Sequence, residues 1–71
     1  MLTVEMNSQE QRLEIYLDEE GVKILRRSLD RLSQRGHDHL MTPSWSGVEL
    51  IEERSGKDTT LIHHVLLVYR G

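Results

Sequence analysis

The fold is decided by residues 2–36, which read LTVEMNSQEQRLEIYLDEEGVKILRRSLDRLSQRG. Apolar and polar residues alternate from Leu2 to Met6 and again from Arg12 to Leu17, with the period of a half-buried β-strand. The polar residues from Asn7 to Glu10 suit the turn between them. This stretch therefore predicts a β-hairpin at the start of the chain.

An amphipathic helix is predicted directly after the hairpin, from about Asp18 to Gln34. The Asp18 side chain can cap the first turn, and Gly36 can end the helix in a left-handed conformation. Apolar residues recur at helical spacing and are expected to face the sheet: they are Val22, Leu25, Leu29 and Leu32. We interpret the charged residues on the other side as a solvated helix face rather than a basic nucleic-acid stripe.

A second hairpin is predicted near the end of the chain, with strands at Val48–Arg54 and Thr59–Arg70 around a turn at 55–58. The expected register pairs Ile51 with Ile62. The chain is thus expected to be an α+β fold in ββαββ order, in which two antiparallel hairpins form a sheet packed by one amphipathic helix.

The predicted sheet has a second apolar side, which a single helix cannot cover. Its residues include Ile62, Leu66 and Val68. Either the long loop from His37 to Gly47 or a second copy of the chain must bury them, because a large exposed apolar patch is unusual on a monomer. A homodimer is therefore one expected state of the protein.

Length and composition favour some classes of protein over others. The 71 residues are expected to form one domain, 1–71, with a core of Leu, Ile and Val because Phe is absent. The absence of cysteine excludes thiolate zinc sites and fits a reducing compartment. A net charge of −3 argues against nucleic-acid binding, and no apolar run is long enough for a membrane span. Since the first residues lack the pattern of a signal peptide, a cytoplasmic location is expected.

Two histidines, His37 and His39, would lie on the same side of an extended chain and could share a metal ion, with His63 or His64 as a third ligand. Only one of His63 and His64 could join them, since neighbours on a strand point to opposite faces. The other interpretation is that these imidazoles hydrogen-bond within the loop or pack beside the sheet. We favour the second interpretation and expect neither a metal nor a cofactor.

Two serines, Ser44 and Ser46, lie near histidines in the sequence, as an activated nucleophile would require. Their surroundings lack the strand-to-helix elbow of serine hydrolases. The neighbouring carboxylates Glu52 and Glu53 would point apart on a strand. We therefore expect a binding protein rather than an enzyme, with a small metal-dependent hydrolase or a homodimeric regulatory module of unknown ligand as the alternatives.

Trp45 is the only Trp and lies in a loop among Pro and Ser. A large amphipathic side chain in such a place either folds back over the sheet or anchors a partner. Acidic residues around it suit a basic partner. The segment from His37 to Glu53 is therefore the predicted partner-binding surface. Its expected contact residues are His37, Asp38, His39, Trp45, Glu49 and Glu53.

The segment HDHLMTPSWSGVEL, residues 37–50, resembles the signature of a small immunity-protein family from bacterial polymorphic toxin systems. In that signature a His-x-His-Leu-Met-Thr run precedes a Trp-Gly-Gly-like turn and an acidic residue, and Ser46 stands here in place of the first glycine. The resemblance implies inhibition of a cognate protein toxin by direct binding, without a reaction. The matching residues that are expected to be structural are Leu40, Met41, Thr42, Gly47 and Leu50.

Overall fold

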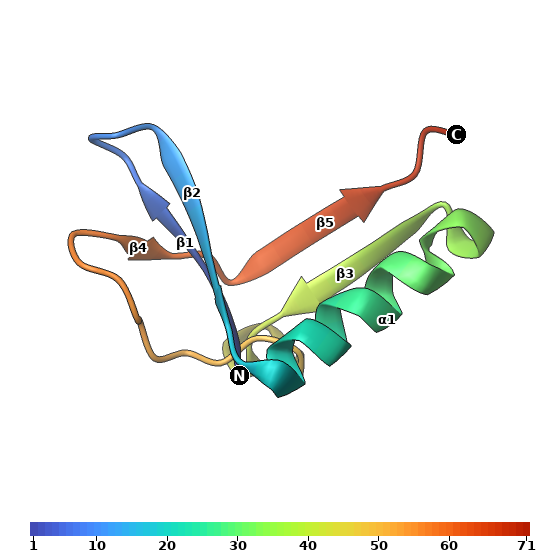
Figure 1. Ribbon diagram of the computed structural model, residues 1–71, viewed down its shortest axis with the longest axis horizontal. Coiled ribbons are helices and arrows are strands. Elements are labelled where there is room, and N and C mark those ends of the chain that lie inside the picture. The colour runs from blue at the N-terminus through green and yellow to red at the C-terminus, as the bar shows by residue number, and fades with distance from the viewer.

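Two small antiparallel sheets and one helix make up the structure, a computed structural model that describes residues 1–71 (Figure 1). The predicted α+β class is confirmed. One sheet has the strand order β2-β1-β4, and the other pairs β3 with β5. The elements follow the chain in this order: β1 (Leu2–Asn7), β2 (Arg12–Leu17), α1 (Glu19–Arg35), β3 (His37–Met41), the 3-10 turn η1 (Pro43–Trp45), β4 (Thr60–Leu61) and β5 (His64–Val68).

The predicted first hairpin is confirmed. β1 and β2 pair in antiparallel register, from Leu2 opposite Leu17 to Asn7 opposite Arg12. Because side chains alternate along a strand, this register places every aliphatic residue of the two strands on one face and the polar residues on the other. The hairpin therefore has one face suited to a core and one suited to polar contacts.

The helix begins and ends within one residue of the predicted bounds. The Asp18 carboxylate accepts a hydrogen bond from the Gly21 N–H at 2.9 Å, and Gly36 closes the helix at a φ of 83° with its N–H bonded to the Leu32 carbonyl. Leu25 packs against the core as predicted, and so does Ile24, which the predicted stripe omitted. Leu29 was expected to face the sheet but is 52% exposed.

The predicted strand at Val48–Arg54 is wrong, and β3 takes its place. β3 pairs with β5, with Leu40 opposite Val65. The backbone around Leu50 forms no ladder, because its hydrogen bonds go to two different strands. The Leu50 N–H donates to the Met41 carbonyl at 3.2 Å, and the Ile51 N–H donates to the Leu2 carbonyl at 3.0 Å. The expected pairing of Ile51 with Ile62 is therefore also wrong.

The last segment of the chain changes partner between its two strands. β4 pairs with β1, and the Ile62 N–H extends this pairing by donating to the Val4 carbonyl at 2.8 Å. The next carbonyl, of His63, accepts from the Thr42 N–H at 3.0 Å, after which β5 pairs with β3. Because the chain changes partner between Ile62 and His64, side chains no longer alternate regularly across this point. Ile62 packs against the core. The prediction that Ile62 shares a face with Leu66 and Val68 is thus wrong.

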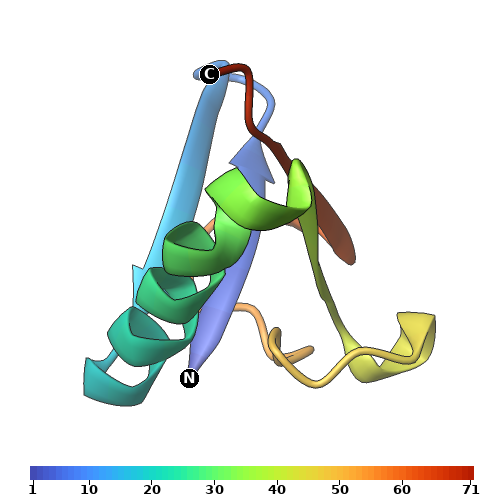
Figure 2. The ribbon, with the colours of Figure 1, turned by 90° about the vertical axis from the view of Figure 1, so that its right-hand side faces the viewer.

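The core lies at the corner where the two sheets meet near the start of α1. From this corner the β1–β2 hairpin diverges from the layer formed by α1, β3 and β5 (Figures 1 and 2). Four aliphatic side chains are buried there, namely Leu2, Val4, Leu40 and Leu50. Partly buried residues of α1 and the last strands surround them: Ile24, Leu25, Ile62, Val65 and Leu67.

The carboxylate of Glu5 is buried on the polar side of the hairpin. Oε1 accepts hydrogen bonds from the Gly56 N–H at 2.9 Å and the Thr59 hydroxyl at 2.7 Å, and Oε2 accepts from the Ser55 N–H at 2.9 Å and the Thr3 hydroxyl at 2.7 Å. Burial by itself raises the pKa of Glu5, but these donors outweigh it and lower the pKa to about 2. Glu5 thus ties the loop before β4 to the sheet.

Candidate partner-binding face

The sheet of β3 and β5 has one side packed on α1 and one side exposed. Asp38 and Leu40 point toward the helix and core and are buried, so the alternate residues of β3 point away. The register places the exposed residues of β5 beside them. We call this side, together with the adjoining Trp45, the outer face; it consists of His37, His39, Met41, Trp45, His64, Leu66 and Val68.

Aromatic rings form a continuous row across the outer face. The His39 and His64 rings stack with centroids 5.0 Å apart, and His39 Nδ1 lies 2.8 Å from His64 Nε2. The His37 ring meets His39 edge-on at 5.1 Å. At the other end the Trp45 ring lies 5.7 Å from His64. Two of the predicted contact residues, His37 and His39, are thus brought together with Trp45 through His64, which the prediction omitted.

Trp45 is held at the end of this row by the short turn η1. Its N–H donates to the Thr42 carbonyl at 2.9 Å, and the preceding residue, Ser44, donates to Glu52 through both its N–H and its hydroxyl. The Ser44 hydroxyl and N–H lower the pKa of Glu52, which keeps this anchor charged. The Trp45 side chain covers part of His64 but remains 55% exposed. Trp45 therefore presents a large apolar area to solvent from a fixed position.

The backbone of the turn after Trp45 favours glycine at both of its positions, 46 and 47. Ser46 has a φ of 66°, a left-handed conformation that glycine adopts without the steric cost of a Cβ. At Gly47 a Cβ would collide with the Met41 backbone. The close approach is fixed by the Gly47 N–H, which donates to the Thr42 carbonyl at 2.9 Å. The chain thus keeps the glycine that packing requires and accepts strain at Ser46.

Asp38, a predicted contact residue, is buried on the helix side of β3. Its Oδ2 accepts hydrogen bonds from the Ser28 hydroxyl and from Arg31, whose Nη2 lies 3.0 Å away, and Arg35 adds an ion pair at 3.6 Å. The Ser28 hydrogen bond, with help from Arg31, lowers the pKa of Asp38 against the effect of burial. Asp38 therefore connects β3 to α1 and is not part of the outer face.

The two predicted glutamates are not on the strands that form the outer face. The Glu49 carboxylate accepts a hydrogen bond from the Met41 N–H at 3.1 Å. Glu49 also lines an open pocket of about 280 Å³ beside α1, with Glu20, Ile24, Arg27, Arg31 and Val48. Glu53 is exposed in the loop that follows Leu50. Neither glutamate thus takes part in the row of aromatic rings.

The remaining residues of the signature form the support of the outer face. Leu40 and Leu50 are core residues. Thr42 is buried, and its hydroxyl lies 2.8 Å from His63 Nδ1. Met41 is half-buried at the end of β3, where its backbone contacts Gly47. The structural roles expected for these residues fit their positions.

The positions of the histidines and of Ser44 are relevant to the two chemical alternatives, a metal site and an activated serine. His37 and His39 lie on one side of β3 as predicted, and His64 joins them, while His63 turns to Thr42. No three histidine, aspartate or glutamate side chains come together as a set that could hold a metal ion. The Ser44 hydroxyl is bonded to Glu52 rather than to an imidazole.

Comparison with known protein families, curated proteins and solved structures finds no match. The chain contains no helix with the length and apolar character of a membrane span.

Proposed function

We propose that this chain is an immunity-type protein that acts in the bacterial cytoplasm and neutralises a cognate toxin by direct protein–protein contact through its outer face. The observation that carries the proposal is the exposure of three large apolar side chains on the outer face. Trp45 of η1 is 55% exposed, and Leu66 and Val68 of β5 are 52% and 51% exposed.

An exposed apolar cluster with a fixed aromatic side chain has the properties of an interface centre. Binding energy at interfaces concentrates in such anchors, and Trp is the residue most enriched among them. The turn η1 orders Trp45 before any partner arrives, so less conformational entropy is lost on binding. The imidazoles of His37, His39 and His64 add hydrogen-bonding groups between the apolar side chains.

The signature of residues 37–50 divides in a way that supports the same proposal. Leu40, Leu50 and Gly47 build the core and the turn, whereas both histidines and Trp45 are exposed to solvent. A sequence motif that served only the fold would have little reason to specify exposed His and Trp side chains. The exposed half of the motif is therefore assigned to the toxin.

The test is the affinity of the chain for the product of a neighbouring toxin gene, measured by calorimetry. Trp45→Ala should weaken binding by about 2 kcal/mol or more, roughly thirtyfold, because an interface anchor is lost. The matched control is Leu29→Ala, which truncates a 52% exposed apolar residue on α1 and should leave the affinity unchanged. Circular dichroism must show that both variants are folded. A folded Trp45→Ala chain that binds like the parent overturns the proposal.

A further inference from the structure

A second surface, far from the outer face in the fold, is incomplete in a single chain. β2 is the end strand of its sheet, and its outer edge pairs with no other strand. The hairpin tip projects away from α1 and β5 (Figure 1). Natural proteins usually protect such an edge, because its free N–H and C=O groups can pair with another chain.

The hydrogen bonds of β1 show which groups of β2 are free. The carbonyls of Leu2 and Val4 bond to Ile51 and Ile62, on the side of β1 away from β2. Leu17 and Ile15 of β2 lie opposite Leu2 and Val4 and form no hydrogen bonds with them. The N–H and C=O groups of Leu17 and Ile15 therefore point away from β1, toward the free edge. The same holds for Leu13, which is two residues before Ile15 on the strand. The free edge of β2 thus offers the backbone of Leu13, Ile15 and Leu17.

The side chains of these same three residues are exposed on the apolar face of the hairpin. Leu13 is 52%, Ile15 48% and Leu17 40% exposed. Beside them an apolar groove of about 220 Å³ runs between the end of β2 and α1, lined by Leu17, Val22, Leu25, Arg26 and Leu29. On the apolar face of the hairpin, Leu2 and Val4 of β1 are therefore buried in the core, whereas the side chains of β2 stay open to solvent.

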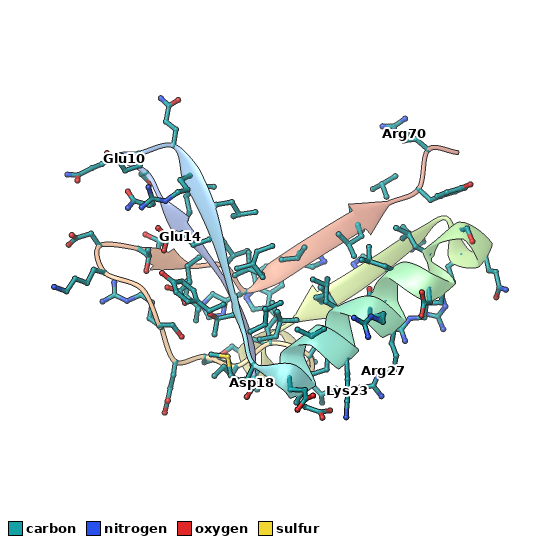
Figure 3. All side chains as sticks on the ribbon, in the orientation of Figure 1. Glu10, Glu14, Asp18, Lys23, Arg27 and Arg70 are labelled. Carbon is teal, nitrogen blue, oxygen red and sulfur yellow. The ribbon has the colours of Figure 1, made fainter.

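The sequence of β2 is complementary to itself when two copies run antiparallel about Ile15. In that register Ile15 meets its own copy and Leu13 meets Leu17, so the free backbone groups face one another and the apolar side chains share one side. On the polar side Glu14 lies opposite Tyr16 and Arg12 opposite Asp18. Figure 3 shows Glu14 on the side of the hairpin away from α1 and Asp18 at the corner with α1.

The charges select this register over the nearest alternative. Arg12 and Asp18 have opposite charges and are both more than half exposed. Within one chain they also pair with Glu14 and with the N-terminal ammonium, so the contact between copies adds to these ion pairs. A shift that centres the pair on Glu14 would instead place two carboxylates directly opposite each other, which is unfavourable. We propose that a second copy of this chain occupies the edge of β2, forming a homodimer with one continuous sheet across the two hairpins. This proposal is independent of the toxin.

The first test is the molar mass by light scattering from micromolar to millimolar concentration. The parent should reach twice the mass of one 8.3 kDa chain. Ile15→Lys places two like charges at the symmetry axis and should halve the mass, while the half-exposed position lets the monomer fold. The control Leu66→Lys changes an equally exposed strand residue on the outer face and should remain dimeric. The proposal is overturned if the parent is monomeric up to millimolar concentration or if folded Ile15→Lys is dimeric. It is also overturned if, of the three chains, Leu66→Lys alone is monomeric.

The second test fixes the register and uses the absence of cysteine in the chain. Opposed Cα atoms in such a strand pair are about 5.5 Å apart, within the range that a disulfide spans. Mild oxidation should therefore convert Ile15→Cys to a covalent dimer much faster than Val68→Cys on the outer face. Equal rates for the two variants would contradict a dimer centred on Ile15.

Discussion

The buried carboxylate of Glu5 is a single residue on which a whole loop depends. Its pKa of about 2 in the folded chain lies below the ordinary value of 4.5. Ionised Glu5 therefore stabilises the fold above pH 4.5, and this contribution is lost as the pH falls from 4.5 toward 2. Neither Glu5 nor its role was predicted, because an alternating Leu-Thr-Val-Glu-Met strand normally exposes its polar residues.

Glu5→Gln should lower the free energy of unfolding at pH 7 by about 3 kcal/mol, since an amide nitrogen would face hydrogen-bond donors. Between pH 4.5 and 2 the variant should also lose less stability than the parent, because one titrating group is gone. Urea unfolding of both chains at several pH values measures the two effects. Parallel stability curves for parent and variant across this pH range would show that Glu5 does not carry the dependence.

At the level of secondary structure, the hairpin and helix were predictable because their signals are local. The turn, the Asp18 cap and Gly36 act within a few residues of the chain. The pairing of β3 was missed because His37, Asp38 and His39 have the polar composition of a loop. Contacts with other elements decide which of these residues are buried: Ser28 and Arg31 of α1 bind Asp38, and β5 pairs with β3. A local sequence pattern does not contain these contacts. Residue type alone singled out His37, His39 and Trp45 as candidates for contact with a partner, and that role stays a prediction.

The link between β3 and α1 can be separated from the surface that β3 carries. Asp38→Ala removes the acceptor of Ser28 and Arg31 and should lower the free energy of unfolding by about 1–3 kcal/mol. Because Asp38 points away from the outer face, the toxin affinity of the folded variant should stay within about threefold of the parent. His39→Ala should instead weaken toxin binding and leave the free energy of unfolding nearly unchanged. Chemical unfolding and calorimetry on both variants test this, and an equal loss of affinity in the two would contradict the division.

The whole molecule carries its two exposed apolar surfaces on different sheets. The outer face belongs to β3 and β5, whereas the free edge belongs to β2, an edge strand of the other sheet. The two layers diverge from a shared corner, so a partner on one need not touch the other (Figures 1 and 2). Self-association through β2 therefore leaves the proposed toxin surface of each copy free.

The most direct test of the proposed toxin surface is an NMR spectrum of the 15N-labelled chain with and without the unlabelled product of a neighbouring toxin gene. Trp45 is the only Trp, so its indole N–H gives one unambiguous signal. This signal should shift on binding, together with those of the β3 and β5 amides, while the β2 amide signals should not move. A stable complex in which the Trp45 signal is unchanged and the shifts fall on β2 or α1 would contradict the proposed toxin surface.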